Sequence, residues 1–220
     1  MSKVIPVVVV AVVLVGGALV LKQFQSSRES LEKPQYTVTT SYEDLELREY
    51  APRVQAQVTV EGPREEATNK GFRILAGYIF GGNTGQEAIA MTAPVSTSAD
   101  TSQSIAMTAP VSTVAQEQGY TISFMMPAKW TLDTLPVPDD ARIELLEVPG
   151  YTAAVRTFSG KVNPDKIDAQ GEKLRASMQA EGLSPDGQVM VSQFDPPWVP
   201  FFMRKNEVEL RVQYSAVPHG

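Results

Sequence analysis

The sequence contains LELREYAPRVQAQVTVEG at residues 45–62 and IELLEVPGYTAAVRTFSG at residues 143–160, which align without gaps at an offset of 98. The identical pairs are Glu46/Glu144, Leu47/Leu145, Glu49/Glu147, Ala56/Ala154, Thr59/Thr157 and Gly62/Gly160. Two unrelated stretches of this length should agree at about one position. The sequence therefore predicts a duplicated strand–strand–helix–strands unit. Amphipathic patterning alone is the alternative explanation.

Alternating hydrophobicity predicts the strands of both copies. In residues 54–60, valine and alanine alternate with glutamine and threonine, and in residues 207–212 apolar residues alternate with charged ones. Shorter alternating patterns occur around residues 122–124 and 143–145. Period-two alternation is typical of half-buried strands.

Each aligned stretch runs into a helical pattern that begins near a proline. The first helix is expected from Pro63 to Phe80 and the second from Pro164 to Ala180. Asn163 is a suitable N-cap for the second helix. The expected stops are Gly81, Gly82 and Gly182, and the expected apolar faces are Phe72, Leu75, Ala76 and Ile79 in the first helix and Ile167, Gly171, Leu174 and Met178 in the second.

These elements predict an α+β fold. Its form is a distorted antiparallel β-barrel built from two pseudo-symmetric β-α-β halves, with two outer helices. We expect the two halves to enclose one apolar interior and to leave an apolar slot along the outside of the first helix.

The N-terminal region predicts a transmembrane helix. Val4–Leu21 is an uncharged run of eighteen residues, about 27 Å long as a helix and close to the thickness of bilayer hydrocarbon. A cleaved signal peptide and a buried core helix are the alternatives. We expect residues 1–30 to be an anchor and linker, 31–216 the folded domain and 217–220 a tail. The protein would be single-pass, with the domain outside the cytoplasm as is usual for a short N-terminal anchor, although the flanking charges favour the opposite orientation.

Composition excludes several kinds of site. Cysteine is absent, which removes disulfides and thiolate chemistry, and His219 is the one histidine, which argues against histidine-based triads and zinc sites. The formal net charge is −6, so nucleic acid is not an expected partner. No acidic pair has a catalytic spacing, and GGNTG at residues 81–85 lacks the lysine of a phosphate loop. The sequence therefore favours a binding protein over an enzyme, with no catalytic residues and no metal ligands assigned.

A second repeat is short and identical. IAMTAPV occurs at residues 89–95 and again at residues 105–111, separated by a polar spacer. We expect the core to need one copy, while the other extends a loop.

Six segments in order resemble one protein family: LELREYAPRVQAQV, GYIFGGN, the doubled IAMTAPV, SFMMPAKWTLDTLPVP, VRTFSG and DPPWVPFFMRKNEVELRV. Together they resemble the SOUL heme-binding protein family, specifically its bacterial branch, from about Tyr36 to Tyr214. The resemblance implies a two-half barrel with one outer helix from each half. It also implies non-covalent binding of heme or free porphyrin, so that the expected partner is a tetrapyrrole.

The resemblance places the tetrapyrrole in a shallow apolar cleft beside the first helix, with basic side chains near its propionates. The residues assigned to cofactor binding in this way are Asn69, Lys70, Phe72, Arg73, Ala76 and Arg204. No clear axial ligand for the iron is present, because His219 lies in the terminal dipeptide.

The residues alone leave other interpretations open. An apolar stripe is more typical of a core face, and Lys70 and Arg73 are typical of a solvated helix face. Arg204 and Lys205 can instead serve the acids of their own strand. A binding module for another planar apolar ligand, as in transcriptional effector domains of similar two-half architecture, is one rival function. A protein-interaction module that uses the apolar residues 196–202 is another. The oligomeric state stays open.

Overall fold

The computed structural model describes residues 31–85, 103–195 and 199–213. The chain divides into two units, residues 1–32 and 33–220, and every element below belongs to the second. In order these are β1 (Tyr36–Ser41), β2 (Glu46–Tyr50), β3 (Arg53–Glu61), α2 (Arg64–Ile79), β4 (Asn83–Thr84), β5 (Val111–Gln116), β6 (Gly119–Met125), β7 (Val137–Pro138), β8 (Glu144–Val148), β9 (Tyr151–Ser159), α3 (Pro164–Ala180), β10 (Pro185–Gln193), η1 (Phe201–Met203) and β11 (Lys205–Val212).

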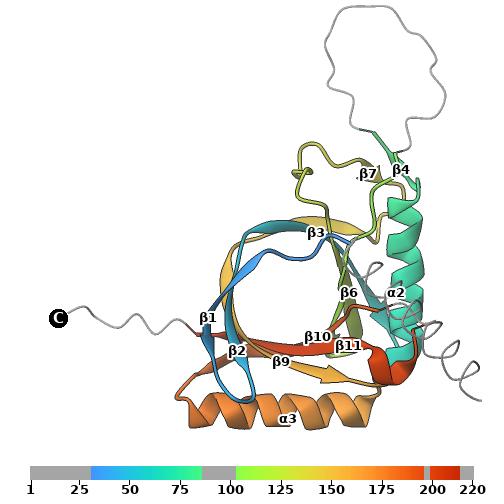
Figure 1. Cartoon of the computed structure of the whole chain (residues 1–220). Helices are drawn as coiled ribbons and strands as arrows, with labels where there is room; N and C mark the ends of the chain where they lie inside the picture. The colour runs from blue at the N-terminus through green and yellow to red at the C-terminus, as the bar shows by residue number, and fades with distance from the viewer. Residues whose placement is uncertain (1–30, 86–102, 196–198, 214–220) are drawn as a thin grey trace, which may run out of the picture. The chain divides into compact units, whose positions relative to one another are not determined.

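A single antiparallel sheet of nine described strands dominates the domain, in the order β1-β2-β9-β11-β10-β5-β6-β3-β8. Figure 1 shows this sheet curling strongly, with α2 and α3 on its outer side. The α+β class and the two outer helices are therefore confirmed. The predicted distorted β-barrel is confirmed in part: β1 and β8 are edge strands, so the sheet forms a half-barrel.

Strand pairing shows the predicted repeat in space. The five pairs between β3 and β8 run from Arg53↔Val148 to Gln57↔Glu144. Shifting each partner by 98 residues gives the five pairs between β2 and β9, from Tyr50↔Tyr151 to Glu46↔Val155. The first strand of each half therefore joins the sheet of the other half, and the two seams have the same register.

The helix boundaries follow the sequence closely. The side chain of Asn163 accepts a hydrogen bond from the Lys166 amide at 2.8 Å, as expected of an N-cap. Gly62 and Gly160, identical in the aligned repeat, lie before the two helices with φ of 107° and 108°. A side chain is strained at such angles, which explains glycine at both positions.

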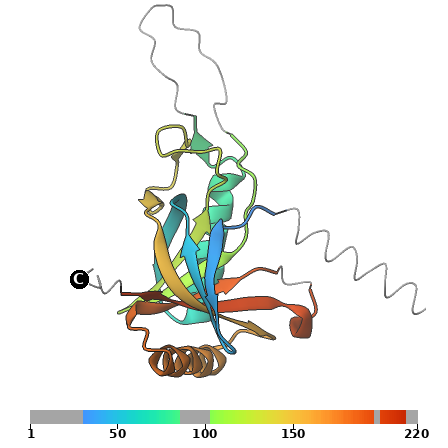
Figure 2. The same ribbon diagram turned by 60° about the vertical axis from the view of Figure 1, so that its left-hand side comes forward.

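The two larger apolar clusters lie between the helices and the outer face of the sheet, and a small third cluster of Tyr50, Ala153 and Val155 lies on the concave side. One cluster beneath α2 includes Leu75, Ile79 and Ile122, and another beneath α3 includes Leu174 and Leu210. Figure 2 shows α3 packed along the outer side of its strands. The predicted single enclosed apolar interior is therefore wrong. β3 and β11 turn their apolar residues outward to a helix, and their polar residues line the concave face. In β9, Ala153 and Val155 instead pack on the concave side.

One copy of the short repeat is built into the α2 core. Ile105 is 1% exposed, and its amide donates to the Ile79 carbonyl at 2.8 Å. Thr108 donates to the Met125 carbonyl, and Val111 begins β5. The copy at residues 89–95 lies outside the described residues.

Within the described residues, no helix is both long enough and apolar enough to cross a membrane. The predicted anchor at residues 4–21 and the tail at residues 217–220 both lie outside them.

Two glycines of α2 give opposite predictions for stability. A Cβ at Gly71 would lie 2.7 Å from Cδ1 and 3.0 Å from Cβ of Ile122, which is fully buried. Gly77 has no atom within 4 Å of such a Cβ. We expect Gly71→Ala to lower the free energy of unfolding by about 1–3 kcal/mol through overpacking. We expect Gly77→Ala to raise it by up to about 1 kcal/mol through helix propensity. Urea unfolding of the full-length variants measures both, and equal effects would contradict the packing of α2 on β6.

Candidate functional site

The concave face of the sheet carries an unusual concentration of charge. Alternate residues of β2 and β11 point away from α3 into the curve, and they include Arg48, Glu207 and Glu209. Their exposed fractions are 3%, 3% and 5%. Buried charges of this kind are stable only when they are paired and hydrogen-bonded.

Arg48 and Glu207 form the central ion pair of this face. The guanidinium donates to both carboxylate oxygens of Glu207 at 3.1 Å, and its Nε donates to Glu46 at 2.8 Å. Glu207 also receives Lys205 Nζ at 2.9 Å and the Thr157 hydroxyl at 3.3 Å. Burial alone would lower the pKa of Arg48, but the hydrogen bonds and the charge of Glu207 hold that pKa above its ordinary value. The Glu207 carboxylate is thus fully engaged within the protein.

A second hydrogen-bonded chain runs from Arg53 to Glu209. Arg53 Nη2 donates to the Tyr151 hydroxyl at 2.9 Å, and that hydroxyl donates to Glu209 Oε1 at 2.7 Å. Arg53 Nη1 is buried and has no hydrogen-bond partner among the described residues. A buried donor without a hydrogen-bond partner costs free energy. This nitrogen is therefore suited to donate a hydrogen bond to an anion that enters the site.

Burial also controls the ionisation of this second chain. It raises the pKa of Glu209, with Tyr151 and Arg53 opposing the effect only in part. It raises the pKa of the Tyr50 and Tyr151 phenols as well, and the nearby charge of Glu209 adds to both. Glu209 is therefore more readily protonated than an ordinary glutamate, and both phenols remain hydrogen-bond donors at neutral pH.

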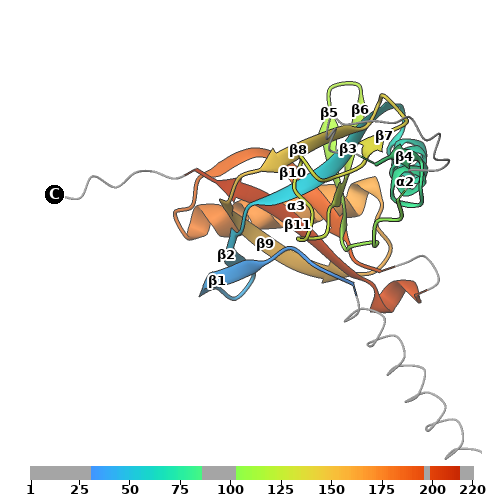
Figure 3. The same ribbon diagram turned by 90° about the horizontal axis from the view of Figure 1, so that it is seen from above.

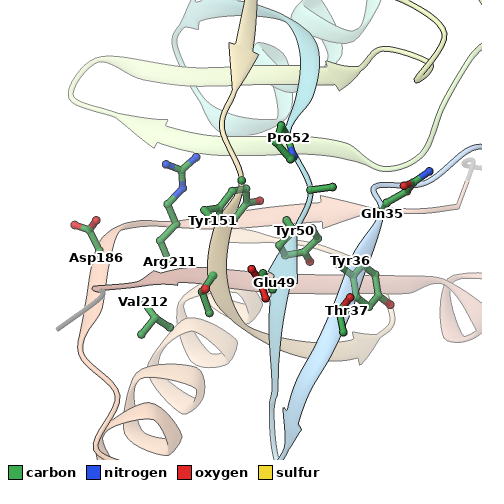
Figure 4. Close-up of a pocket in the computed structure, with 13 residues that line it drawn as sticks. Gln35, Tyr36, Thr37, Glu49, Tyr50, Pro52, Tyr151, Asp186, Arg211 and Val212 are labelled. Carbon is green, nitrogen blue, oxygen red and sulfur yellow. The ribbon is translucent and has the colours of Figure 1, made fainter. Parts of the chain in front are cut away.

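Three tyrosines separate an outer cleft from a smaller inner chamber. Tyr36, Tyr50 and Tyr151 line both spaces. The ring centroids of Tyr36 and Tyr50 are 5.4 Å apart, and those of Tyr50 and Tyr151 are 5.0 Å apart and nearly stacked. Figure 4 shows the rings side by side across β1, β2 and β9, with Arg211 next to Tyr151. We call the outer space the tyrosine cleft; its volume is about 860 Å³, and the inner chamber holds about 50 Å³.

The two spaces differ in charge. The acidic side chains of the tyrosine cleft are Glu49 and Asp186, opposed by Arg211. Four basic and two acidic side chains line the inner chamber: Lys33, Arg48, Arg53 and Lys205 against Glu207 and Glu209. The chamber therefore has an excess of positive charge at the end of an aromatic surface. That combination suits a planar ligand that carries an anionic group.

The residues expected on the first helix lie on the exposed side of α2. Asn69, Lys70 and Arg73 are exposed, Phe72 is 38% exposed and Ala76 is half-buried. Leu75 and Ile79, from the same predicted stripe, are buried in the core. The stripe is thus divided between core and surface, and Phe72 stays at its edge with its ring 5.4 Å from that of Phe124.

Arg204 does not join the α2 residues. It follows η1, and Figure 3 shows α2 and this short helix in separate parts of the domain. Arg204 Nε donates to the Val199 carbonyl at 2.8 Å. Its neighbour Lys205 pairs with Glu207, as the alternative interpretation of this basic pair suggested. The assignment of the α2 residues and Arg204 to a ligand stays a prediction, and neither of the two pockets described above is lined by any of them.

Sequence reasoning missed the tyrosines and the buried charges. The available signal was the polar half of each alternating pattern, because Glu207, Glu209 and Arg211 occupy every second position of one strand. The pattern shows that they share a face, but curvature of the sheet decides that this face is buried. Arg53 and Tyr151 occupy equivalent positions of the repeat, yet differ in type, so identity between the copies did not select them.

The raised pKa of Glu209 predicts a pH-dependent stability. The folded state favours the protonated carboxyl, so the contribution is fully present below the ordinary glutamate pKa and is lost as pH rises through the folded-state pKa. Glu209→Gln cannot ionise and keeps an oxygen acceptor for Tyr151. Relative to wild type, the variant should therefore gain free energy of unfolding between pH 4 and pH 8. Urea unfolding at several pH values tests this, and a constant difference would contradict an ionisable Glu209.

The chain is similar to known proteins both in sequence and in fold. Residues 31–211 match the family model described as SOUL heme-binding protein. Two curated relatives are named Heme-binding protein 2: the human protein is 28% identical over 75% of this chain and 76% of its own length, and the mouse protein is 27% identical over 71% and 74%. Among solved structures, the EcmrR C-terminal domain is similar in fold at a TM-score of 0.53, with 14% identity over 81% of this chain and 98% of that domain. A hydrolase from Listeria innocua has a TM-score of 0.52, with 12% identity over 80% of this chain and 94% of that chain. The chain belongs to the SOUL heme-binding protein family.

Proposed function

We propose that this protein binds heme or another porphyrin without a covalent bond. The observation that carries the proposal is the family match, which extends over nearly the whole described domain. Two curated relatives that carry heme binding in their names support it.

The chemistry of the described residues fits the ring and its carboxylates. A porphyrin is flat and apolar and carries carboxylates, so it needs aromatic or aliphatic contact together with cations. The domain offers the tyrosine cleft and the basic inner chamber for this purpose. Heme, when bound, would also supply iron, which needs an axial ligand to be held strongly.

The iron itself has little support from the described side chains. A tyrosine hydroxyl is one kind of iron ligand, but Tyr78 is 1% exposed and its hydroxyl donates to the Pro136 carbonyl at 2.8 Å. Met125 and Met126 are buried, and buried methionine normally serves packing. His219 lies outside the described residues. We therefore propose that the protein recognises the porphyrin ring, and that binding does not require iron.

Titration with two ligands tests this proposal. Full-length protein should shift the Soret band of hemin and quench the fluorescence of metal-free protoporphyrin, with dissociation constants that agree within about threefold. Close agreement is expected because shared ring and carboxylate contacts would supply most of the affinity.

The outcomes separate the alternatives. Absence of binding by both ligands at micromolar protein would reject tetrapyrrole binding. Competition by uncharged planar aromatic molecules at similar concentration would favour the rival module for another planar ligand. Binding of hemin alone would show that iron is ligated.

We also propose that residues 4–21 anchor the protein in a membrane, with the domain on the outer side. The support is the uncharged apolar run, which is long enough to span the hydrocarbon.

The full-length protein should stay in the membrane fraction after an alkaline carbonate wash. The double variant Val9→Lys and Val13→Lys should be released, because each central lysine costs about 2.5–3.5 kcal/mol on insertion. Digestion of the domain by protease added outside the intact membrane tests the orientation, and release of the wild-type protein by carbonate would reject the anchor.

A further inference from the structure

We infer that the porphyrin binds in the tyrosine cleft, with its ring against Tyr36, Tyr50 and Tyr151 and one carboxylate on Arg53. This inference rests on the proposed function and specifies its site. It moves the ligand from the outer side of α2 to the concave face of the sheet.

The three tyrosines line the cleft that would take the flat ligand, with Tyr50 5% exposed between the other two and the Tyr36 ring tilted by 60° to that of Tyr50. They occupy one row of the sheet, since Tyr36 pairs with Tyr50 and Tyr50 pairs with Tyr151 across adjacent strands. Cations already lie against this surface: Arg211 Cζ is 4.4 Å from the centroid of the Tyr151 ring, and Arg48 Cζ is 4.3 Å from that of Tyr36. Rings that are held by neighbouring charges and by each other lose little freedom when a ligand stacks on them.

The inner chamber supplies the anion contact. Arg48 pairs with Glu46 and Glu207, and Lys205 pairs with Glu207. Arg53 donates to the Tyr151 hydroxyl, lies over the faces of two rings and interacts with the charge of Glu209. Its Nη1 is the buried donor without a described partner. A carboxylate that passes the tyrosine rings would give this nitrogen a charge-assisted hydrogen bond in a small, water-poor space.

Charges at the mouth of the tyrosine cleft set the direction of the ligand. Glu49 would repel a carboxylate that faces the rim beside β2, whereas the charge of Asp186 is opposed by Arg211, its register partner across β10 and β11. Arg211 is exposed and lies at the opposite end of the tyrosine row from Tyr36, where it can meet a second carboxylate. A porphyrin with two carboxylates would therefore point one toward Arg53 and the other toward Arg211.

The outer side of α2 offers fewer contacts for a porphyrin than the tyrosine cleft does. Phe72 is a single partly exposed ring that already packs edge-on against Phe124. Lys70 and Arg73 are exposed to solvent, where the strength of an ion pair is small. Arg73 Nε also donates to the Asn69 carbonyl at 3.2 Å.

Matched variants of the full-length protein test the site with metal-free protoporphyrin and with its dimethyl ester, which lacks free carboxylates. The cleft variants are Tyr36→Ala, Arg53→Gln and Arg211→Gln, and their controls on α2 are Phe72→Ala and Arg73→Gln. Arg53→Gln should weaken protoporphyrin binding by about tenfold, the usual effect of losing a charged hydrogen bond. Arg211→Gln should weaken it by about two- to fivefold, because an ion pair exposed to solvent contributes less. Tyr36→Ala should weaken both ligands, whereas the arginine changes should leave ester binding within about twofold of wild type. The α2 variants should bind both ligands as wild type does.

Each result has a defined meaning. If the α2 variants lose affinity and the cleft variants do not, the inference is overturned while the proposed function stands. Unchanged affinity in all five variants, with a wild type that binds, also rejects the cleft. A wild type that binds neither ligand rejects the proposed function and the inference with it. Arg211 is exposed, so Arg211→Gln decides the anion contact should Arg53→Gln unfold, as near-ultraviolet circular dichroism would reveal.

Discussion

The bidentate pair between Arg48 and Glu207 is the interaction on which the concave face depends. Arg48 belongs to the first half and Glu207 to the second, and the pair bridges them across β9. Removing either member would leave a buried charge without its partner, which typically costs about 3–5 kcal/mol. Because the pair satisfies both charges within the fold, Arg48 and Glu207 can be buried on the concave face. The apolar residues of the same strands are then available to the helices on the other side.

The exchanged strands explain why the two halves form one domain. β2 pairs with β9 and β8 pairs with β3, so neither half completes its sheet alone. A third contact joins the halves through β5 and β10, where the hydroxyls of Ser112 and Ser192 are 3.1 Å apart. Pairing between strands far apart in sequence costs loop-closure entropy before the contacts between them form. The two halves should therefore fold in one step rather than one after the other. The same arrangement places residues from both halves, such as Arg53 and Tyr151, at one site.

Local sequence signals determined much of this architecture, and curvature determined the rest. The cap at Asn163, the glycines at 62 and 160 and the span of α3 followed from residues that act within one turn of chain. Alternation in β11 identified two faces correctly, but it could not say that the face of Glu207 and Glu209 would be covered. That fact depends on contacts with β2 and β9, more than fifty residues away in sequence. The α2 stripe is divided for a related reason, since helical spacing groups Phe72 with Leu75 although Leu75 is fully buried and Phe72 stays 38% exposed at the edge of the contact with the sheet.

The edge strand β1 forms one side of the tyrosine cleft and can detach from the sheet by local unfolding. All six of its residues are exposed, and among the described strands it pairs with β2 alone. Segments with so little burial detach at a small fraction of the free energy of global unfolding. Tyr36 would leave with β1, while Tyr50 and Tyr151 would stay on the inner strands. A broad, rigid molecule would then enter the cleft from the side while β1 is detached from β2. Renewed pairing of β1 with β2 would enclose the molecule.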